Sequence, residues 1–281
     1  MKIETELKKL DAFYQNMEYQ KIEPFLVEKI AEAKECESYD AYLAFSNELI
    51  GFYRSISEHD QSLVIAEDVL LLMEELGMEE TVHFGTSLLN AATAYRAAGK
   101  NREALGYYER ALVLYEKTLE QEDYRFASLY NNISILLSQM GEIKKAILFL
   151  DNAISVISKI MPGSVELASS FTNKALLLFQ TSQRNEAMAL LEEALLIFEK
   201  EKNKNDPHYS AALAGVGEAY YHLGDFPKSV QAYEKSIHMI EQVYGKNESY
   251  CIVCYNYSVV CHEAGMTEKE VFYKKEAEGM I

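Results

Sequence analysis

The chain has 281 residues, 49% of them hydrophobic and 25% charged, and its formal net charge is −17. A surface of that sign repels DNA, RNA and anionic lipid, so the composition argues against nucleic-acid and membrane-surface partners. Only 13 Gly and 4 Pro interrupt long runs with helical apolar spacing, which predicts a mostly helical protein. No run of about 18 apolar residues is present, so we expect no membrane span.

The first forty residues favour two helices, near 3–16 and 19–36, with Pro24 tolerated in the first turn of the second. The amino terminus, MKIETELKKLDAF, lacks the uninterrupted apolar stretch of a signal peptide. Four Cys do not suggest a disulfide scaffold. We therefore expect a cytoplasmic protein with reduced thiols.

From residue 41 onward the chain repeats itself. The stretch 94–116 returns at 136–158, 178–200 and 220–242, and more weakly at 52–74. A Gly or Ser permits a tight reversal between two helices. One recurs every 41 or 42 residues, in what we name the turn register: Ser57, Gly99, Gly141, Ser182, Gly224 and Gly265. Small residues at fixed distances before and after each turn let the two helices of a pair approach closely, and stacked pairs bury apolar faces that one pair cannot.

We count seven helix pairs, at 1–40, 41–80, 81–122, 123–164, 165–205, 206–247 and 248–281. The pair 1–40 is degenerate, as expected of a terminal cap, and 41–281 holds about six repeats. KEKNKNDP, at 200–207, is the best candidate for a linker, but the repeat spacing continues through it. The sequence therefore predicts one continuous domain over 1–281.

These registers resemble the tetratricopeptide repeat. EALGYYERAL (103–112), EAMALLEEAL (186–195) and KSVQAYEKSI (228–237) look like its second helix, although its usual Trp is absent. The repeat is about eight residues longer than the typical 34. YERALVLYEKTL (108–119) followed by LYNNISIL (129–136) resembles the long kinesin light chain type. The resemblance implies an all-α, right-handed superhelical solenoid of antiparallel helix pairs with an inner, concave groove.

A row of Asn residues occupies one position on the first helices. Asn90, Asn132, Asn173 and Asn256 each lie nine residues before their turn residue, whereas the pair 206–247 has Gly215 there. By resemblance this position faces the groove and grips the backbone of an extended peptide. A carboxamide suits that role because it offers a donor and an acceptor together. The alternative is that each Asn binds its own backbone or a neighbouring helix.

Other side chains are expected to complete the groove lining. Arg54, Arg96 and Lys174 are cations that would suit an acidic ligand segment or a free carboxylate, unless they are solvated or paired within the fold. The remaining members of the predicted set are Asn131, Gln139, Gln180, Glu218 and Tyr221.

Candidates for chemistry are weak. CIVCYNYSVVCH (251–262) contains a C-x-x-C, but Cys254 and Cys261 occupy positions held elsewhere by large apolar residues, so we expect them in the core. No nucleophile–base arrangement, phosphate loop or metal-ligand spacing is evident. We expect no cofactor, no metal and no enzymatic activity.

The sequence thus predicts an intracellular scaffold that holds an extended peptide or protein segment in its groove. Two alternatives stay open. One is a stand-alone peptide-sensing regulator of a bacterial signalling system, and the other is a structural adaptor that forms homo-oligomers through an uncapped C-terminal end.

Overall fold

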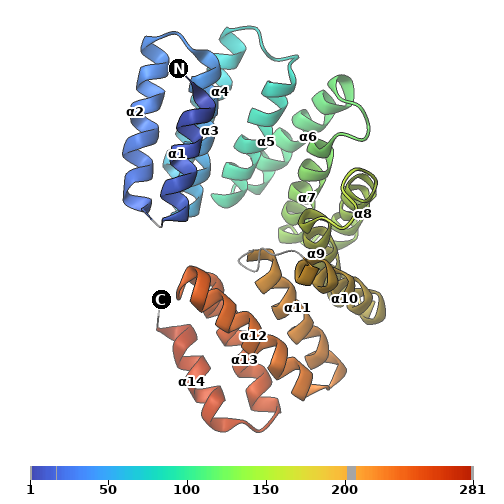
Figure 1. Cartoon of the computed structure of the whole chain (residues 1–281). Coiled ribbons are helices and arrows are strands. Elements are labelled where there is room, and N and C mark those ends of the chain that lie inside the picture. Colours follow the sequence, from blue (N-terminus) through green and yellow to red (C-terminus); the bar gives the residue numbers. More distant parts are fainter. Residues whose placement is uncertain (1, 17, 201–206, 280–281) are drawn as a thin grey trace. The chain divides into compact units, whose positions relative to one another are not determined.

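The structure, a computed structural model, describes residues 2–16, 18–200 and 207–279, and this part of the chain is helical and contains no strand (Figure 1). Besides a 3₁₀ turn at Tyr19–Lys21, the helices are α1 (Ile3–Gln15), α2 (Ile22–Glu35), α3 (Tyr39–Ser55), α4 (His59–Glu75), α5 (Val82–Ala97), α6 (Asn101–Thr118), α7 (Tyr124–Gln139), α8 (Ile143–Ile160), α9 (Val165–Gln180), α10 (Arg184–Lys200), α11 (Pro207–Leu223), α12 (Phe226–Tyr244), α13 (Glu248–Glu263) and α14 (Thr267–Glu278).

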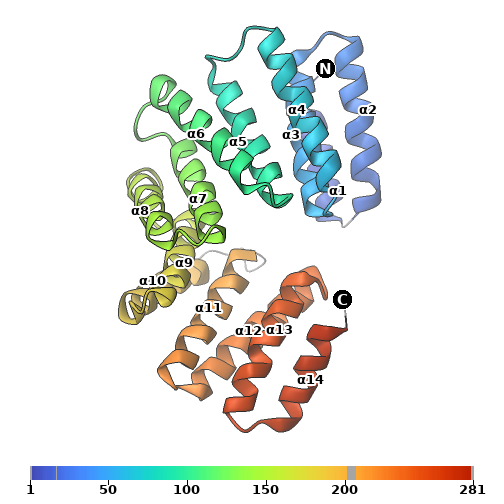
Figure 2. The same ribbon diagram turned by 180° about the vertical axis from the view of Figure 1, so that it is seen from behind.

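The helices follow one another in seven consecutive pairs, which confirms the all-α array of hairpins predicted from the sequence. They form two compact units, residues 1–136 and 137–281, which divide within α7. In the first unit α3 packs with α4 and α5 with α6; in the second, α9 packs with α10, α11 with α12 and α13 with α14. The same neighbours lie side by side when the molecule is turned around (Figure 2).

The N-terminal pair differs slightly from its predicted bounds. A 3₁₀ turn precedes α2, so the regular helix begins at Ile22 and not at 19. Pro24 lies in the first turn of α2, where its missing N–H removes no helical hydrogen bond. The predicted linker candidate at 200–207 falls mostly on 201–206, outside the described residues.

The turn register has a single backbone conformation. Its four Gly have φ between 71° and 80°, and its two Ser, Ser57 and Ser182, have φ of 62° and 63°. This left-handed conformation satisfies carbonyl groups at the end of a helix and reverses the chain, and Gly adopts it without steric cost. The sequence pattern therefore located the turn within each of the six pairs from α3–α4 to α13–α14.

The small-residue positions are where the two helices of a pair approach most closely. Five residues after each of the first five turns lies a side chain that is 0% exposed: Ser62, Ala104, Ala146, Ala187 and Ser229. Where this residue is Ser, its hydroxyl donates across the hairpin to a main-chain carbonyl of the first helix, from Ser62 to Ile50 at 3.1 Å and from Ser229 to Gly217 at 2.7 Å. Both acceptors lie seven residues before the turn, so the same hydrogen bond recurs at equivalent places.

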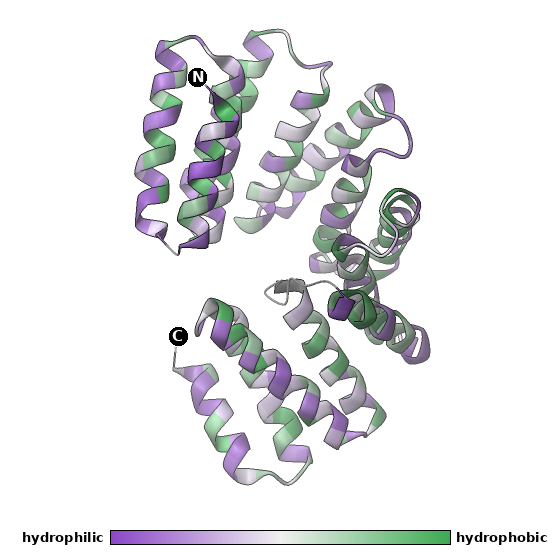
Figure 3. Ribbon diagram, viewed as in Figure 1, coloured by the Kyte–Doolittle hydropathy of each residue, from purple (hydrophilic) through white to green (hydrophobic). Residues whose placement is uncertain are grey.

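Each helix carries hydrophobic and hydrophilic residues along its length (Figure 3), and the hydrophobic ones build the core of its unit. In the second unit Cys254 and Cys261 are 0% exposed and pack in a cluster with Tyr233 and Tyr257. Burial raises the pKa of the Cys254 thiol to about 11, which favours the unreactive protonated form. The expected core role of these two Cys is confirmed. No helix in the described part of the chain is long and apolar enough to cross a membrane.

Candidate functional site

The Asn register places one carboxamide on the first helix of four hairpins. Asn90 lies on α5, Asn132 on α7, Asn173 on α9 and Asn256 on α13, and all four side chains are half-buried. Half-burial leaves part of each carboxamide accessible to a ligand. The first two belong to the first unit and the last two to the second.

In the first unit the carboxamides already form hydrogen bonds. Asn90 donates from Nδ2 to Oδ1 of Asn47 on α3 at 2.8 Å, which links two neighbouring pairs. Asn132 donates from Nδ2 to the main-chain oxygen of Ser128 at 2.9 Å, within its own helix. Both alternatives left open by the sequence are therefore realised. The carbonyl oxygens Oδ1 of Asn90 and Asn132 receive no hydrogen bond from any described residue.

In the second unit the two Asn side chains are uncommitted. Neither Asn173 nor Asn256 forms a hydrogen bond with another residue in the part of the chain that the structure describes. A half-buried carboxamide without partners has its donors and its acceptor available to a ligand. These two residues are thus better placed to hold a peptide group than Asn90, whose Nδ2 is already engaged.

A polar hollow of about 510 Å³ lies in the first unit, and we name it the double-arginine pocket. Arg54 on α3 and Arg96 on α5 line it together with Asn90, Thr93 and Asn132. Burial lowers the pKa of Arg54, and the charge of nearby Arg96 lowers it further. The structure therefore brings together four of the residues predicted from sequence for the groove.

Lys174 is placed differently from the two arginines. Its side chain is 15% exposed and pairs with Asp151 on α8 at 2.9 Å and with Glu186 on α10 at 3.1 Å. Burial alone would lower the pKa of Lys174, but the two acidic partners outweigh that effect and raise the pKa. A ligand that uses this cation has to share it with two acids of the fold.

The remaining predicted residues are spread along the first helices. Asn131 is half-buried on α7 and is absent from the lining of the double-arginine pocket. Gln139 and Gln180 are exposed at the last residues of α7 and α9. Tyr221 is half-buried, and its ring lies 6.1 Å from that of Phe226, so it supports the α11–α12 hairpin.

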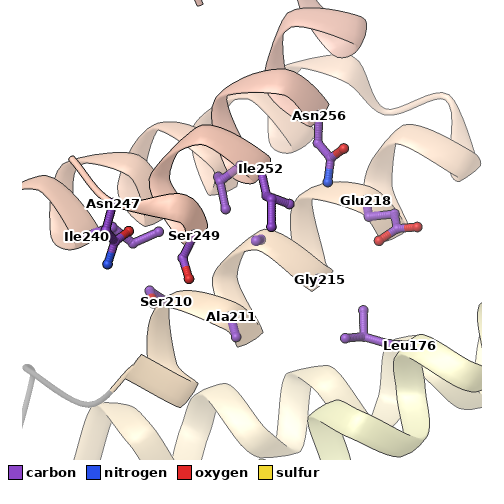
Figure 4. Close-up of a pocket in the computed structure, with 12 residues that line it drawn as sticks. Leu176, Ser210, Ala211, Gly215, Glu218, Ile240, Asn247, Ser249, Ile252 and Asn256 are labelled. Atoms are coloured by element: carbon purple, nitrogen blue, oxygen red, sulfur yellow. The ribbon is translucent and has the colours of Figure 1, made fainter. Parts of the chain in front are cut away.

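A second hollow, of about 350 Å³, lies between α11 and α13 in the second unit and contains two further predicted residues, Glu218 and Asn256. Figure 4 shows Asn256 and Ile252 on α13 facing the part of α11 that carries Gly215 and Glu218. Gly215 replaces the Asn of the row in this pair, and Leu176 packs against it, since a Cβ at Gly215 would lie 3.1 Å from Cδ2 of Leu176. The hollow is mostly apolar.

Sequence reasoning missed Ile252, which is 55% exposed in that hollow. It lies one helical turn before Asn256, and the equivalent positions in earlier pairs are Thr86, Ser128 and Ser169. The repeat spacing therefore marks Ile252 as a residue of the same face, but Ile is so common in helices that its identity alone does not indicate a binding role.

The sequence is similar to those of known repeat proteins. The profile of the tetratricopeptide repeat family matches residues 84–159 and 166–242, which is more than half of the chain. Protein KINESIN LIGHT CHAIN-RELATED 3 of Arabidopsis thaliana is 24% identical over 208 residues, covering 73% of this chain and 32% of that protein. KINESIN LIGHT CHAIN-RELATED 1 of the same plant is 23% identical over 266 residues, covering 89% of this chain and 41% of that protein. The chain thus spans well under half the length of these relatives.

Solved structures share the fold. A Rap protein complexed with Competence and Sporulation Factor superposes with a TM-score of 0.69 at 14% identity, over 98% of this chain and 75% of that one. BtubC (BKLC) from P. vanneervenii superposes with a TM-score of 0.64 at 17% identity, over 78% of this chain and 89% of that one. At such identities the likeness concerns the fold. The chain belongs to the tetratricopeptide repeat family, and its long repeats are of the kinesin light chain type.

Proposed function

We propose that this protein is a non-catalytic scaffold that holds an extended segment of a partner protein against its first helices. The tetratricopeptide fold supports a role in protein–protein interaction. The proposal that the protein holds an extended segment rests on the row of half-buried Asn side chains at one position of four first helices. These side chains have hydrogen-bonding groups that no described residue uses.

The chemistry of the row suits a peptide backbone. A peptide group presents one N–H donor and one C=O acceptor, and a carboxamide complements both without reading the side chain. Asn173 and Asn256 offer both groups, whereas Asn90 and Asn132 offer at least their carbonyl oxygens. A row held on packed helices is preorganised, so less conformational entropy is lost when a ligand binds.

Charge and shape add selectivity in each unit. Arg54 and Arg96 favour acidic groups of the partner in the first unit, and the apolar hollow beside Ile252 accepts an apolar side chain in the second. The uninterrupted repeat spacing supports the further proposal that 1–281 is one continuous array.

The experiment compares Asn→Leu variants on first helices with the same change on a second helix. Leu is close in size to Asn but offers no hydrogen bond. Asn132→Leu and Asn173→Leu should each weaken binding to an array of immobilised unstructured peptides by roughly two- to tenfold, the value of one hydrogen bond. Asn152→Leu, on the exposed face of α8, serves as the control. Unchanged binding by the folded double variant Asn132→Leu/Asn173→Leu would refute the proposal.

A second candidate function is a peptide-responsive regulator. The Rap protein superposes on nearly all of this chain. A regulator of this kind should change its compactness when a peptide binds, whereas a passive scaffold should not. Small-angle scattering with and without a peptide selected from the array distinguishes the two, because an unchanged radius of gyration excludes a ligand-driven closure.

A further inference from the structure

The double-arginine pocket contains two positive charges that no described acidic side chain neutralises. Its walls come from α3, α5 and the first part of α7, all within the first unit. Arg54 lies three residues before Ser57, and Arg96 lies three residues before Gly99, so the two arginines occupy equivalent positions in neighbouring pairs. Both side chains reach the same hollow.

Neither arginine has an acidic partner or a hydrogen bond among the described residues. The Nε of Arg96 is buried and has no acceptor. Two of the other three arginines in the same unit are paired, Arg110 with Glu74 at 3.5 Å and Arg125 with Asp123 at 2.6 Å, and the third, Arg102, is exposed to solvent. In a chain with a net charge of −17, these two half-buried cations share one hollow without an acidic partner among the described residues.

Keeping these like charges together is unfavourable without a ligand. Burial and the charge of Arg96 both lower the pKa of Arg54, which means that the pocket destabilises its charged form. An anion between the two guanidinium groups reverses that effect, and each group can donate two parallel N–H bonds to an oxyanion. Asn90 and Asn132 line the same hollow, and each Nδ2 has a second hydrogen that can donate to an oxyanion.

The amount of uncompensated charge indicates the class of anion. A single carboxylate neutralises one guanidinium and leaves the other without a counter-charge. A phosphoryl group carries about −1.5 to −2 charges at pH 7 and has three terminal oxygens, which matches two forked donors. We propose that the double-arginine pocket binds a phosphoryl group between Arg54 and Arg96, either as free phosphate or on a side chain of the extended segment, and in the latter case the inference rests on the proposed function.

The test measures binding of small probes directly, without any partner protein. Inorganic phosphate, N-acetyl-O-phosphoserine amide and N-acetyl-aspartate amide are titrated calorimetrically into the full chain at constant ionic strength and pH 7.4. The two phosphoryl probes separate the two sources of the group, and the aspartate probe represents a single carboxylate. We expect at least one phosphoryl probe to bind about tenfold more tightly than the aspartate probe.

Variants assign the binding to the pocket. Arg54→Gln and Arg96→Gln should each weaken phosphoryl binding about tenfold, since each removes a charge-assisted pair of hydrogen bonds. Arg96→Lys, which keeps the charge but loses the fork, should bind with intermediate affinity. Arg102→Gln removes an equal charge from an exposed position on α6 and should change the affinity less than about twofold.

The outcomes separate this inference from the proposed function. Equal or tighter binding of the aspartate probe, or unchanged phosphoryl binding in folded Arg54→Gln and Arg96→Gln, would overturn the phosphoryl assignment. Asn173→Leu, in the other unit, should leave phosphoryl binding intact while it weakens peptide binding. Circular dichroism of every variant verifies that the helices are formed.

Discussion

Gly217 is the position where the packing of a hairpin can be tested most directly. It lies on α11 in the small-residue position seven before the turn, where other pairs have Ala92, Ser134 or Ala175. A Cβ at Gly217 would lie 2.7 Å from Cδ2 of Tyr233 on α12, well inside normal contact distance. The Tyr233 ring is 2% exposed and stacks on Tyr257, with ring centroids 5.9 Å apart, so it has little room to move.

Two opposing effects set the magnitude for Gly217→Ala. Replacing Gly by Ala within a helix stabilises it by about 1 kcal/mol, because the unfolded chain loses conformational freedom. Forcing an extra methyl into a filled core costs about 1–3 kcal/mol. The net change in unfolding free energy is therefore a loss of up to about 2 kcal/mol.

Gly106→Ala supplies the matched control, since a Cβ at this exposed position on α6 meets no heavy atom within 4 Å. Only the helix-propensity gain should remain there, so Gly106→Ala should stabilise the protein by about 0.5–1 kcal/mol. Urea unfolding followed by circular dichroism at 222 nm measures both variants, because the chain has no Trp for fluorescence.

Relief of the clash provides the decisive comparison. The position of Tyr233 is occupied by Leu150 and Leu191 in other pairs, so Tyr233→Leu is compatible with the repeat. In a double-mutant cycle, Gly217→Ala and Tyr233→Leu should be coupled by about 1–3 kcal/mol, with the double variant more stable than the sum of the single changes predicts. A Gly217→Ala variant as stable as Gly106→Ala, or a coupling near zero, would refute the packing argument.

Three further predictions concern stability and assembly. Ser229→Ala removes the 2.7 Å hydrogen bond to the Gly217 carbonyl, at a position where three other pairs have Ala. Urea unfolding should show that the unfolding free energy falls by about 1 kcal/mol, and a fall well above about 2 kcal/mol would contradict this. Lys246 lowers the pKa of Glu276, so the ionised carboxylate stabilises the fold at pH values above its unfolded pKa, and this stabilisation disappears as the pH falls through the lower folded pKa. The melting temperature of Glu276→Gln should therefore fall less on acidification than that of the wild type. An equal fall in the two proteins would exclude the effect. Phe272 on α14 is 54% exposed, and an exposed aromatic side chain suits the self-association that the sequence left open. In that case sedimentation should show a mass that rises with concentration in the wild type and a monomer for Phe272→Glu.

The fold was predictable because its determinants are local and repeated. Each turn residue, such as Gly99 or Gly141, has to adopt a left-handed conformation, and each small residue, such as Ala104, has to admit a neighbouring helix. Requirements of this kind select residue types at fixed spacing, and the spacing is visible in one sequence. The 3₁₀ turn before α2 was not predicted because it occurs once, in the degenerate first pair, and has no repeated pattern.

The candidate site was predictable only in part, because a register specifies where a side chain lies but not what surrounds it. Arg54 and Lys174 look alike in the sequence, as cations on first helices. Lys174 meets Asp151 and Glu186, which project from the second helices α8 and α10. No such acid faces Arg54 among the described residues, so only the three-dimensional packing distinguishes a paired cation from one available to a ligand.

The same distinction decides between the two Asn residues in the middle of α7. Asn131 and Asn132 are adjacent and both half-buried, and helix propensity disfavours them equally. Only Asn132 belongs to a row, and it also lines the double-arginine pocket, where its Nδ2 is fixed by Ser128 and its Oδ1 is left unused. A carboxamide that is fixed through Nδ2 and whose Oδ1 receives no hydrogen bond can accept one from a peptide N–H of a ligand. Its helix-propensity penalty of about 0.7 kcal/mol or less is comparable to the roughly 0.5–1.5 kcal/mol of one hydrogen bond to a ligand, so one such bond offsets it.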